Sequence, residues 1–328
     1  MGRSVVRVSI EKLLSEADAT GFRPDILEKV AHLLNLLKVI RSHPFLKGKL
    51  VLKGGTALNL FFFNVPRLSV DIDLNYIGAE NRETMLSERP KVEQSMQSVF
   101  SREGFVVKRI PTEHAGGKWI LGYQSALGQN ANLDIDINFM FRIPLWTVNS
   151  LDSYMVGSWY AKSIPVINIH ELAAGKLAAL LSRCQARDIF DSHKILQMKS
   201  IDQKRLRTAF VVYGAMNRKD WRNVSINDVR LDINDLERLL IPTLQKSTIH
   251  GIKKISEFGH KLVQECQQRL SAILPFTKKE KEFLDLILEK GEICPSLITS
   301  DNSIQYLIAR HPLIKWKAFN VRQYKNSS

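Results

Sequence analysis

Residues 51–78, VLKGGTALNLFFFNVPRLSVDIDLNYIG, place a double glycine before a helix-like segment and then two aspartates inside an apolar strand. Strand residues two positions apart lie on the same face, about 7 Å apart, so Asp71 and Asp73 can converge on one or two hard cations. A carboxylate pair among Val, Ile and Leu is expensive to bury unless a cation meets it. The stretch therefore predicts a cation-binding face on a strand.

The glycine pair, Gly54 and Gly55, adds a second element to this prediction. Backbone amides at a glycine turn that opens a helix can hold a phosphate, although no GK[ST] follows here, so the pair is not a Walker loop. A carboxylate pair on the neighbouring strand can hold Mg²⁺ that bridges the bound phosphates. The combination indicates a nucleotide site.

A second acid motif lies at residues 131–141, ANLDIDINFMF. Its alternation puts Asp134 and Asp136 on one face of a strand and apolar residues on the other, so either acid could supply a third carboxylate. The spacing D-x-D-x-N also opens an EF-hand loop, but Tyr76 and Phe139 stand where that loop needs glycine. We therefore expect two strands and no calcium loop.

Hydrophobic periodicity divides the chain into an α/β half and a helical half. The helices expected in the first half lie at 24–41, 56–63 and 82–103, and the strands at 49–53, 69–76, 105–110, 119–125 and 131–141. Long amphipathic segments follow Pro165. We expect an α+β fold with a mixed β-sheet in residues 1–150, a helical domain in 151–241 and a further helical region in 242–328.

The composition is that of a basic globular protein. The 328 residues carry a formal net charge of +14 and 45% apolar residues, which predicts a real core and a surface that attracts polyanions, above all nucleic acid. Its three cysteines form no CxxC pair, and no apolar run approaches the ~20 residues of a membrane span. We expect a cytoplasmic protein. GxSxG and HExxH are absent, which argues against serine hydrolases and zinc proteases.

The segment KGGTALNLFFFNVPRLSVDIDL resembles the glycine-turn and D-x-D signature of the DNA polymerase β-type nucleotidyltransferase superfamily. More narrowly it resembles the AbiEii/AbiGii toxin family, relatives of the MenT toxins, in which Arg and Ser commonly precede the acids as Arg67 and Ser69 do here. A second segment, HELAAGKLAALLSRCQARDIFD, matches the family pattern E-x-x-A-x-K-L-x-A-L followed by R-D-x-x-D. The resemblance implies a polymerase β-type core and a helical domain that completes the active site.

Carried over residue by residue, the resemblance implies a Mg²⁺ site at Asp71, Asp73 and Asp136, of which Asp136 fits the family pattern better than Asp134. Lys176 would meet the triphosphate and so make the acids tolerable. A further catalytic acid would be Asp188 or Asp191, and the pattern does not choose between them. The nucleotide would contact Gly54, Gly55, Thr56, Arg67, Ser69 and Lys176.

Two arginines follow Lys176 in the second segment. On an uninterrupted helix, Arg183 and Arg187 would lie near the face of Lys176 and form a basic wall for phosphate or RNA. Alternatively, Arg187 pairs with Asp191 at the i,i+4 spacing.

The implied function is a Mg²⁺-dependent nucleotidyltransferase toxin of a toxin–antitoxin system, associated with phage defence. It would transfer a nucleoside monophosphate from an NTP to a hydroxyl, with the 3′ end of tRNA as acceptor, and so block translation; an AbiEi-like antitoxin would be its partner. A rival acceptor is a protein side chain, against which the positive charge argues mildly. A rival from another class is an inactive nucleic-acid-binding module, but Gly55, Asp71, Asp73 and Lys176 are all retained.

Overall fold

The computed structural model describes residues 8–326, which form two compact units. The first unit contains the described residues up to Arg142 together with Val148–Ile167 and Ile241–Lys253. The second contains Ile143–Thr147, Asn168–Leu240 and the described residues from Lys254 onward. The three-part division at residues 150 and 241 stays a prediction. No helix in the described part of the chain combines the length and the apolar character needed to span a bilayer.

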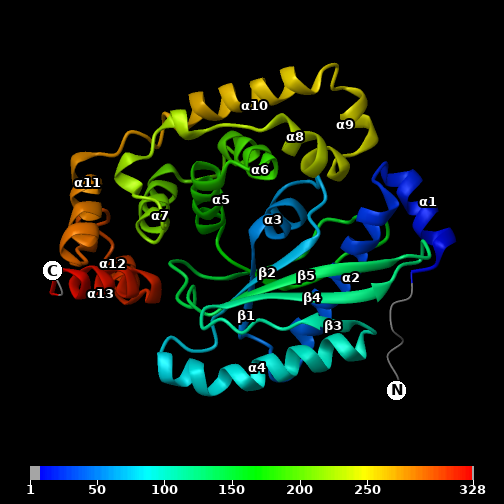
Figure 1. Ribbon diagram of the computed structural model, residues 1–328, viewed down its shortest axis with the longest axis horizontal. Coiled ribbons are helices and arrows are strands. Elements are labelled where there is room, and N and C mark those ends of the chain that lie inside the picture. The colour runs from blue at the N-terminus through cyan, green and yellow to red at the C-terminus, as the bar shows by residue number, and fades with distance from the viewer. Residues whose placement is uncertain (1–7, 327–328) are drawn as a thin grey trace. The chain divides into compact units, whose positions relative to one another are not determined.

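The first unit is built on a mixed seven-stranded sheet with the order β3-β4-β5-β2-β1-β7-β6 (Figure 1). Two neighbouring pairs, β2 with β5 and β1 with β7, run parallel, and the other four pairs are antiparallel. The strands are β1 Leu50–Lys53, β2 Asp71–Tyr76, β3 Val106–Arg109, β4 Gly116–Gln124, β5 Asn130–Asn138, β6 Asn149–Leu151 and β7 Ile164–Val166.

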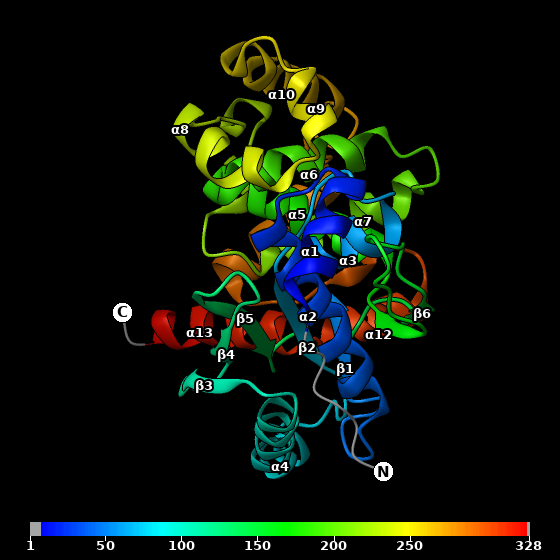
Figure 2. The same ribbon diagram turned by 90° about the vertical axis from the view of Figure 1, so that its right-hand side faces the viewer.

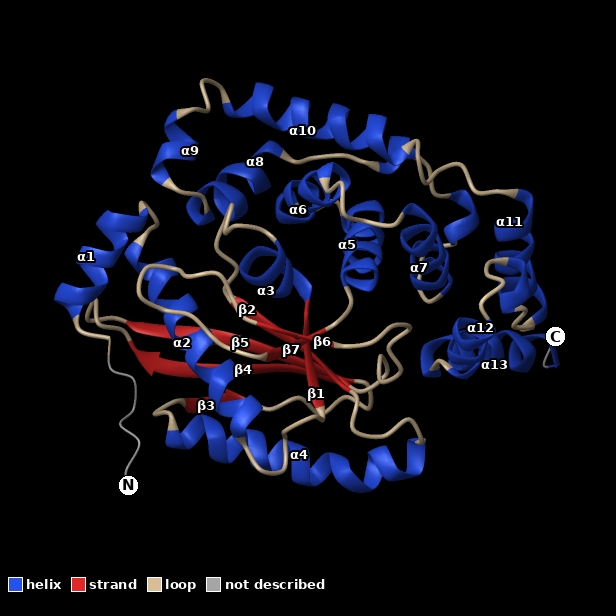
Figure 3. Ribbon diagram, turned by 180° about the vertical axis from the view of Figure 1, so that it is seen from behind, coloured by secondary structure: helices blue, strands red, loops and turns tan. Residues whose placement is uncertain are grey.

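Helices surround this sheet. α4 runs beneath the strands, α2 crosses the same face beside it, and α3 lies on the opposite side, as Figures 1 and 3 both show. Figure 2 shows α4 against the edge strand β3. The helices of this unit are α1 Ile10–Thr20, α2 Pro24–Ser42, α3 Gly54–Ala57, continued by a π-helical turn at Leu58–Phe62, α4 Arg82–Arg102 and α9 Lys246–His250, which follows a 3₁₀ turn at Ile241–Thr243.

The apolar face of the sheet packs against α2 and α4. In β5, Leu133, Ile135 and Ile137 are buried, whereas the residues that alternate with them are only half-buried. On the same face, Trp119 of β4 meets Phe100 of α4 with ring centroids 5.6 Å apart. A strand that alternates in this way buries one side only, so the acidic residues are left on the opposite side.

The second unit is helical. Its core lies between α5, α6 and α7, and α10 packs along α6. Its longer helices are α5 Ile169–Arg183, α6 Ala186–Gln197, α7 Gln203–Ala215, α10 Ile255–Leu270, α11 Lys278–Asp285, α12 Asn302–Arg310 and α13 Pro312–Asn326. Shorter helical turns lie at Trp221–Asn223, Ile226–Asp228, Ile233–Asp235 (α8), Leu236–Leu240, Leu286–Lys290 and Pro295–Leu297.

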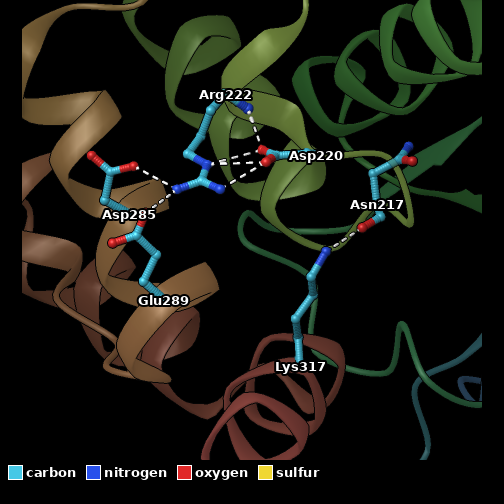
Figure 4. Close-up of polar contacts among 6 residues, drawn as sticks. All are labelled: Asn217, Asp220, Arg222, Asp285, Glu289 and Lys317. Carbon is cyan, nitrogen blue, oxygen red and sulfur yellow. Dashed lines mark hydrogen bonds and ion pairs between the residues drawn. The ribbon is translucent and has the colours of Figure 1, made fainter. Parts of the chain in front are cut away.

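Ion pairs connect the turn after α7 to the C-terminal helices of this unit (Figure 4). The Arg222 guanidinium donates to Asp220 at 2.7 Å, to Asp285 at 3.1 Å and to Glu289. Lys317 of α13 donates to the backbone carbonyl of Asn217. Residues 217–222 are therefore tied to α11, to the π-helical turn that follows α11, and to α13.

The predicted α+β architecture, with a mixed sheet followed by a helical half, is confirmed. The helices expected at 24–41 and 82–103 are α2 and α4, and all five predicted strands are present with small shifts of their ends. Helix α1 and the strands β6 and β7 were not predicted. β6 and β7 have three residues each, which is too short for alternation to be recognised.

Two helical glycines of the second unit should respond oppositely to a methyl group. A Cβ on Gly175 would meet Tyr213 at an ordinary contact distance of 3.5 Å, so Gly175→Ala should stabilise the protein by about 0.5–1 kcal/mol through helix propensity. A Cβ on Gly214 would collide with the indole of the fully buried Trp221, so Gly214→Ala should destabilise it by about 1–3 kcal/mol. Urea unfolding of the two variants measures both effects, and shifts of the same sign would contradict this packing.

Candidate active site

Four carboxylates gather on one face of the sheet. β2 and β5 pair in parallel, with Asp71 opposite Asp134 and Asp73 opposite Asp136. Residues opposite one another in adjacent strands point to the same side, and neighbouring strands are about 5 Å apart. The two D-x-D motifs thus form one acidic patch, which we call the acid face. All four side chains are half-buried rather than sealed in the core.

The acid face has its own cation, which the sequence did not reveal. Lys118 of β4 lies opposite Asp136, and its ammonium contacts the Asp134 carboxylate at 3.0 Å. That hydrogen bond raises the pKa of Lys118, and the charges of Asp71 and Asp136 add to the effect, although burial works against it. Only the antiparallel register of β4 and β5 brings this lysine to the acids, and a single sequence carries no clear signal of that register.

Across the sheet, β1 leads directly from the acid face into the glycine turn. Lys53, the last residue of β1, pairs with Asp73, and Gly54 follows with φ +77°, in the left-handed region that favours glycine. A Cβ at Gly54 would collide with the Asp73 carboxylate. The Thr56 hydroxyl donates to the backbone carbonyl of Asp71 at 2.5 Å. The turn and the acid strand are therefore in direct contact, and α3 begins at Gly54, two residues before the predicted start.

Arg67 and Ser69, which precede the acids, are buried. Arg67 is only 2% exposed and donates to the carbonyl of Leu68 at 2.9 Å. The Leu68 amide in turn donates to the carbonyl of Thr243 at 2.8 Å. The structure thus joins this segment to residues 241–243 of the same unit. β2 begins at Asp71, two residues later than expected.

Carboxylate oxygens are the ligands that Mg²⁺ prefers, and the acid face supplies them. The Asp73 carboxylate lies directly against Gly54, in the space that a Cβ would fill. In residues 8–326, no three His, Cys, Asp or Glu side chains are already drawn together as a metal site. Like charges on adjacent strands repel one another until a cation joins them, and Asp134 is turned to Lys118. The residue types and their common face fit Mg²⁺.

The predicted residues of the helical half form a cluster within the second unit. The Lys176 ammonium contacts Asp188 at 2.9 Å and Asp191 at 3.1 Å, and Arg183 donates to Asp188 at 2.7 Å. The side chains of Lys176, Asp188 and Asp191 are 9%, 1% and 0% exposed. Burial raises the pKa of Asp188, but the charges of Lys176 and Arg183 outweigh it and hold this pKa below its usual range. Both candidate acids therefore contact the same lysine.

The helix that carries Lys176 does not continue to Arg187. Cys184 adopts a left-handed conformation with φ 53°, so α5 ends at Arg183, and α6 begins at Ala186. The uninterrupted helix considered in the sequence analysis is therefore wrong. The break folds Asp188 back toward Lys176, which a continuous helix would not do.

Glu171 is a buried carboxylate to which the sequence pattern assigned no role. It accepts hydrogen bonds from the amides of Leu145 and Trp146, at 3.1 and 3.2 Å, and from the Tyr213 hydroxyl at 3.2 Å. Burial raises the pKa of Glu171 from 4.5 to about 7, although the two amide hydrogen bonds oppose the shift. This side chain holds the 143–147 segment to α5 within the second unit.

Comparisons with known proteins agree with this architecture. The family model described as the nucleotidyl transferase AbiEii toxin of type IV toxin–antitoxin systems matches residues 35–262. Among solved structures, MenT4, a nucleotidyltransferase toxin from Mycobacterium tuberculosis H37Rv, superposes with a TM-score of 0.59 at 17% identity. The match covers 92% of this chain and 99% of MenT4, and at this identity it shows a common fold. None of the curated protein sequences compared with the chain matches it.

Removing the charge of Lys176 should test how strongly its cluster holds α5 and α6 together. Lys176→Met leaves two buried carboxylates without their shared cation and should lower the free energy of unfolding by about 3–5 kcal/mol. Arg183→Met is the matched control, because this side chain is 57% exposed and Asp188 keeps Lys176 as a partner, so its loss should cost only about 1–2 kcal/mol. Denaturant titration gives both values, and equal losses would contradict the central position of Lys176.

Stability should depend on pH through Glu171. The folded protein holds the Glu171 proton more tightly than the unfolded chain, so this contribution is full below pH 4.5 and is lost as the pH rises through about 7. The loss should amount to roughly 3 kcal/mol, and Glu171→Gln should abolish it. The exposed control, Glu282→Gln, should keep the wild-type slope. Unfolding free energies measured across this range would contradict the assignment if Glu171→Gln kept that slope too.

Proposed function

The chain belongs to the AbiEii family of nucleotidyltransferase toxins of type IV toxin–antitoxin systems, and we propose that it transfers a nucleoside monophosphate from an NTP to the 3′ end of tRNA with the help of Mg²⁺. One observation carries the proposal. Asp73 and Asp136 are opposite one another in parallel strands, and the left-handed Gly54 turn abuts the Asp73 carboxylate. A phosphate-binding turn beside paired acids is what transfer from a triphosphate requires.

The acid face supplies the metal ligands of this proposal. Asp71, Asp73 and Asp136 would hold Mg²⁺, which when bound neutralises phosphate charge and lowers the pKa of an attacking hydroxyl. Asp136 is favoured over Asp134 because Asp136 is opposite Asp73, whereas Asp134 is engaged by Lys118. This lysine limits the negative charge of the acid face and so allows an anionic nucleotide to approach.

The proposed reaction is a simple displacement at the α-phosphorus, in which one bond forms and one bond breaks. The acceptor hydroxyl oxygen forms a bond to the α-phosphorus, the bond from that phosphorus to the bridging oxygen breaks, and pyrophosphate leaves. Asp136 would take the hydroxyl proton. The backbone amides of Gly54, Gly55 and Thr56 would bind the phosphates. Arg67 and Ser69, for which the family resemblance implies contact with the nucleotide, are buried, so they would instead support the segment that leads into the acid strand.

In the second unit, Lys176 remains our proposal for the cation that contacts the triphosphate. An ammonium has three N–H donors, and Asp188 and Asp191 engage two of them. Among the described residues the Lys176 ammonium has no third acceptor, so one of its N–H groups can donate to a phosphate oxygen. The two acids would hold the charge in place and thereby act through Lys176.

The acceptor and the partners follow from charge and family. A net charge of +14 favours a polyanionic acceptor, because phosphate contacts supply affinity without sequence readout. Modification of the tRNA 3′ end would block translation, and a protein antitoxin would restrain the enzyme in the cytoplasm. The second candidate is transfer to a protein hydroxyl, which the same acid face could catalyse.

Two matched variants on one strand test the reaction. The purified protein is incubated with total tRNA, Mg²⁺ and each NTP labelled at its α-phosphate. Asp136→Asn should lower transfer by more than about a hundredfold, whereas Asp134→Asn, two residues away on the same face, should lower it by less than about tenfold. A larger loss with Asp134→Asn would reverse the assignment of the third acid.

The same incubation decides between the acceptors. Label on tRNA that disappears with Asp73→Asn supports the proposal, and label on a protein band instead would establish the second candidate. Label on neither would contradict transfer to tRNA, because NTP, Mg²⁺ and RNA are all supplied.

A further inference from the structure

A hollow of about 630 Å³ lies in the first unit, away from the acid face. It opens between the C-terminal half of α2, the end of α4 and the loop at 158–162. α2 packs on the sheet face opposite the acids. Its volume is that of a small-ligand site. The residues that line it are Asn35, Lys38, Val39, Arg41, Ser42, Glu103, Ser158, Trp159, Tyr160 and Lys162.

The charge of this hollow is unbalanced. Lys38, Arg41 and Lys162 are exposed, and among residues 8–326 none of the three forms an ion pair with a carboxylate. Glu103 is the acidic residue of the lining, and Asn35 donates to one of its oxygens at 2.7 Å. Three cations face one acid, so the hollow attracts an anionic ligand.

Two aromatic side chains, Trp159 and Tyr160, line the hollow beside these cations, on a loop that hydrogen bonds hold in place. The backbone at 153–161 is a narrow hairpin, in which the Ser153 amide donates to the carbonyl of Ala161 at 2.8 Å. Its tip is tied to α1, because the Ser158 amide donates to Glu16 at 3.1 Å. Tyr160 is 40% exposed, so its ring can contact a ligand. Because the hairpin is already held in place, binding costs little conformational entropy of the loop.

Cations interleaved with aromatic rings are the recognition chemistry of single-stranded nucleic acid. The Lys162 ammonium lies 5.5 Å from the centroid of the Tyr160 ring, and that of Lys12 lies 5.4 Å from the centroid of Trp159. Lys38 and Arg41 lie one turn apart on α2, whereas Lys162 is on the hairpin. Cations on two elements suit successive phosphates of a strand better than one compact triphosphate.

We propose that this hollow binds an unpaired segment of the RNA acceptor, with a base on Tyr160 and the flanking phosphates on Lys38, Arg41 and Lys162. The inference rests on the proposed function in one respect, since the RNA is the acceptor of that reaction. It assigns substrate-binding residues outside the acid face. The bound strand would use ring stacking for a base of any identity and cations for its backbone.

The test measures RNA binding directly, by fluorescence anisotropy of a labelled short single-stranded RNA without NTP or Mg²⁺. Lys38→Ala/Arg41→Ala/Lys162→Ala should weaken binding by about tenfold or more and reduce the salt dependence, as the slope of log K against log salt, by roughly 2. The control, Lys278→Ala/Lys279→Ala/Lys281→Ala, removes the same charge from exposed positions of α11 and should weaken binding by less than about threefold. Thermal unfolding checks that both proteins are folded.

A second pair of variants, both at Tyr160, distinguishes the contribution of ring stacking to RNA binding from that of charge. Tyr160→Ala should weaken binding by about fivefold or more, whereas Tyr160→Phe, which keeps the ring, should bind as the wild type does. Because the ring is exposed, neither change should disturb the fold.

The outcomes are distinct from those of the transfer assay. Wild-type protein that does not bind RNA at low salt, or a pocket variant that binds no worse than the α11 control, would overturn the inference. Pocket-dependent RNA binding together with transfer to a protein would support the hollow as an RNA site and overturn tRNA as the acceptor.

Discussion

The parallel pairing of β2 with β5 is the constraint on which the first unit depends. It places Asp71, Asp73, Asp134 and Asp136 on one face, where like charges repel and cannot be buried without cations. The opposite face is apolar and is covered by α2 and α4, so the sheet is fully packed on one side only. The acid side stays half-buried, with Lys118 as a fixed cation and the Gly54 turn in contact with Asp73. The electrostatics of that one pairing are the basis of the metal and substrate site that we propose.

In the second unit, by contrast, the clustered charged side chains are buried and paired with one another. Lys176, Asp188 and Asp191 are almost completely buried, and they are tolerated because each charge has a partner within about 3 Å. Glu171 is also buried, and three hydrogen-bond donors partly offset its loss of water while its pKa rises to about 7. Paired burial makes a rigid joint between α5 and α6. In the acid face the charges are in excess, which favours ligands, whereas in the helical cluster the same residue types hold helices together.

The basic residues of the chain likewise fall into two groups: some contact acidic or carbonyl groups within the fold, and others do not. Arg222 and Lys317 are used within the second unit, where they connect the turn after α7 to the C-terminal helices (Figure 4). Lys38, Arg41 and Lys162 line a hollow instead, and among the described residues none of them forms an ion pair with a carboxylate. Net charge alone does not distinguish these groups. The distinction lies in whether the fold brings an acid to the cation, and it decides which basic residues remain available to a polyanion.

The sequence by itself determined the α+β class, the two acid strands and the helical half, because alternation and helical periodicity are local signals that survive in any tertiary setting. It also indicated that Asp134 and Asp136 share a face. Tertiary structure alone decided which strands pair: the register that sets Asp136 opposite Asp73 and brings Lys118 to Asp134 joins residues far apart in the chain. The break at Cys184 was equally hidden, since its left-handed φ is unusual for a residue other than glycine, and it is this break that turns Asp188 back to Lys176. Periodicity reports which side of an element is buried, whereas the partner of each charge depends on packing between elements.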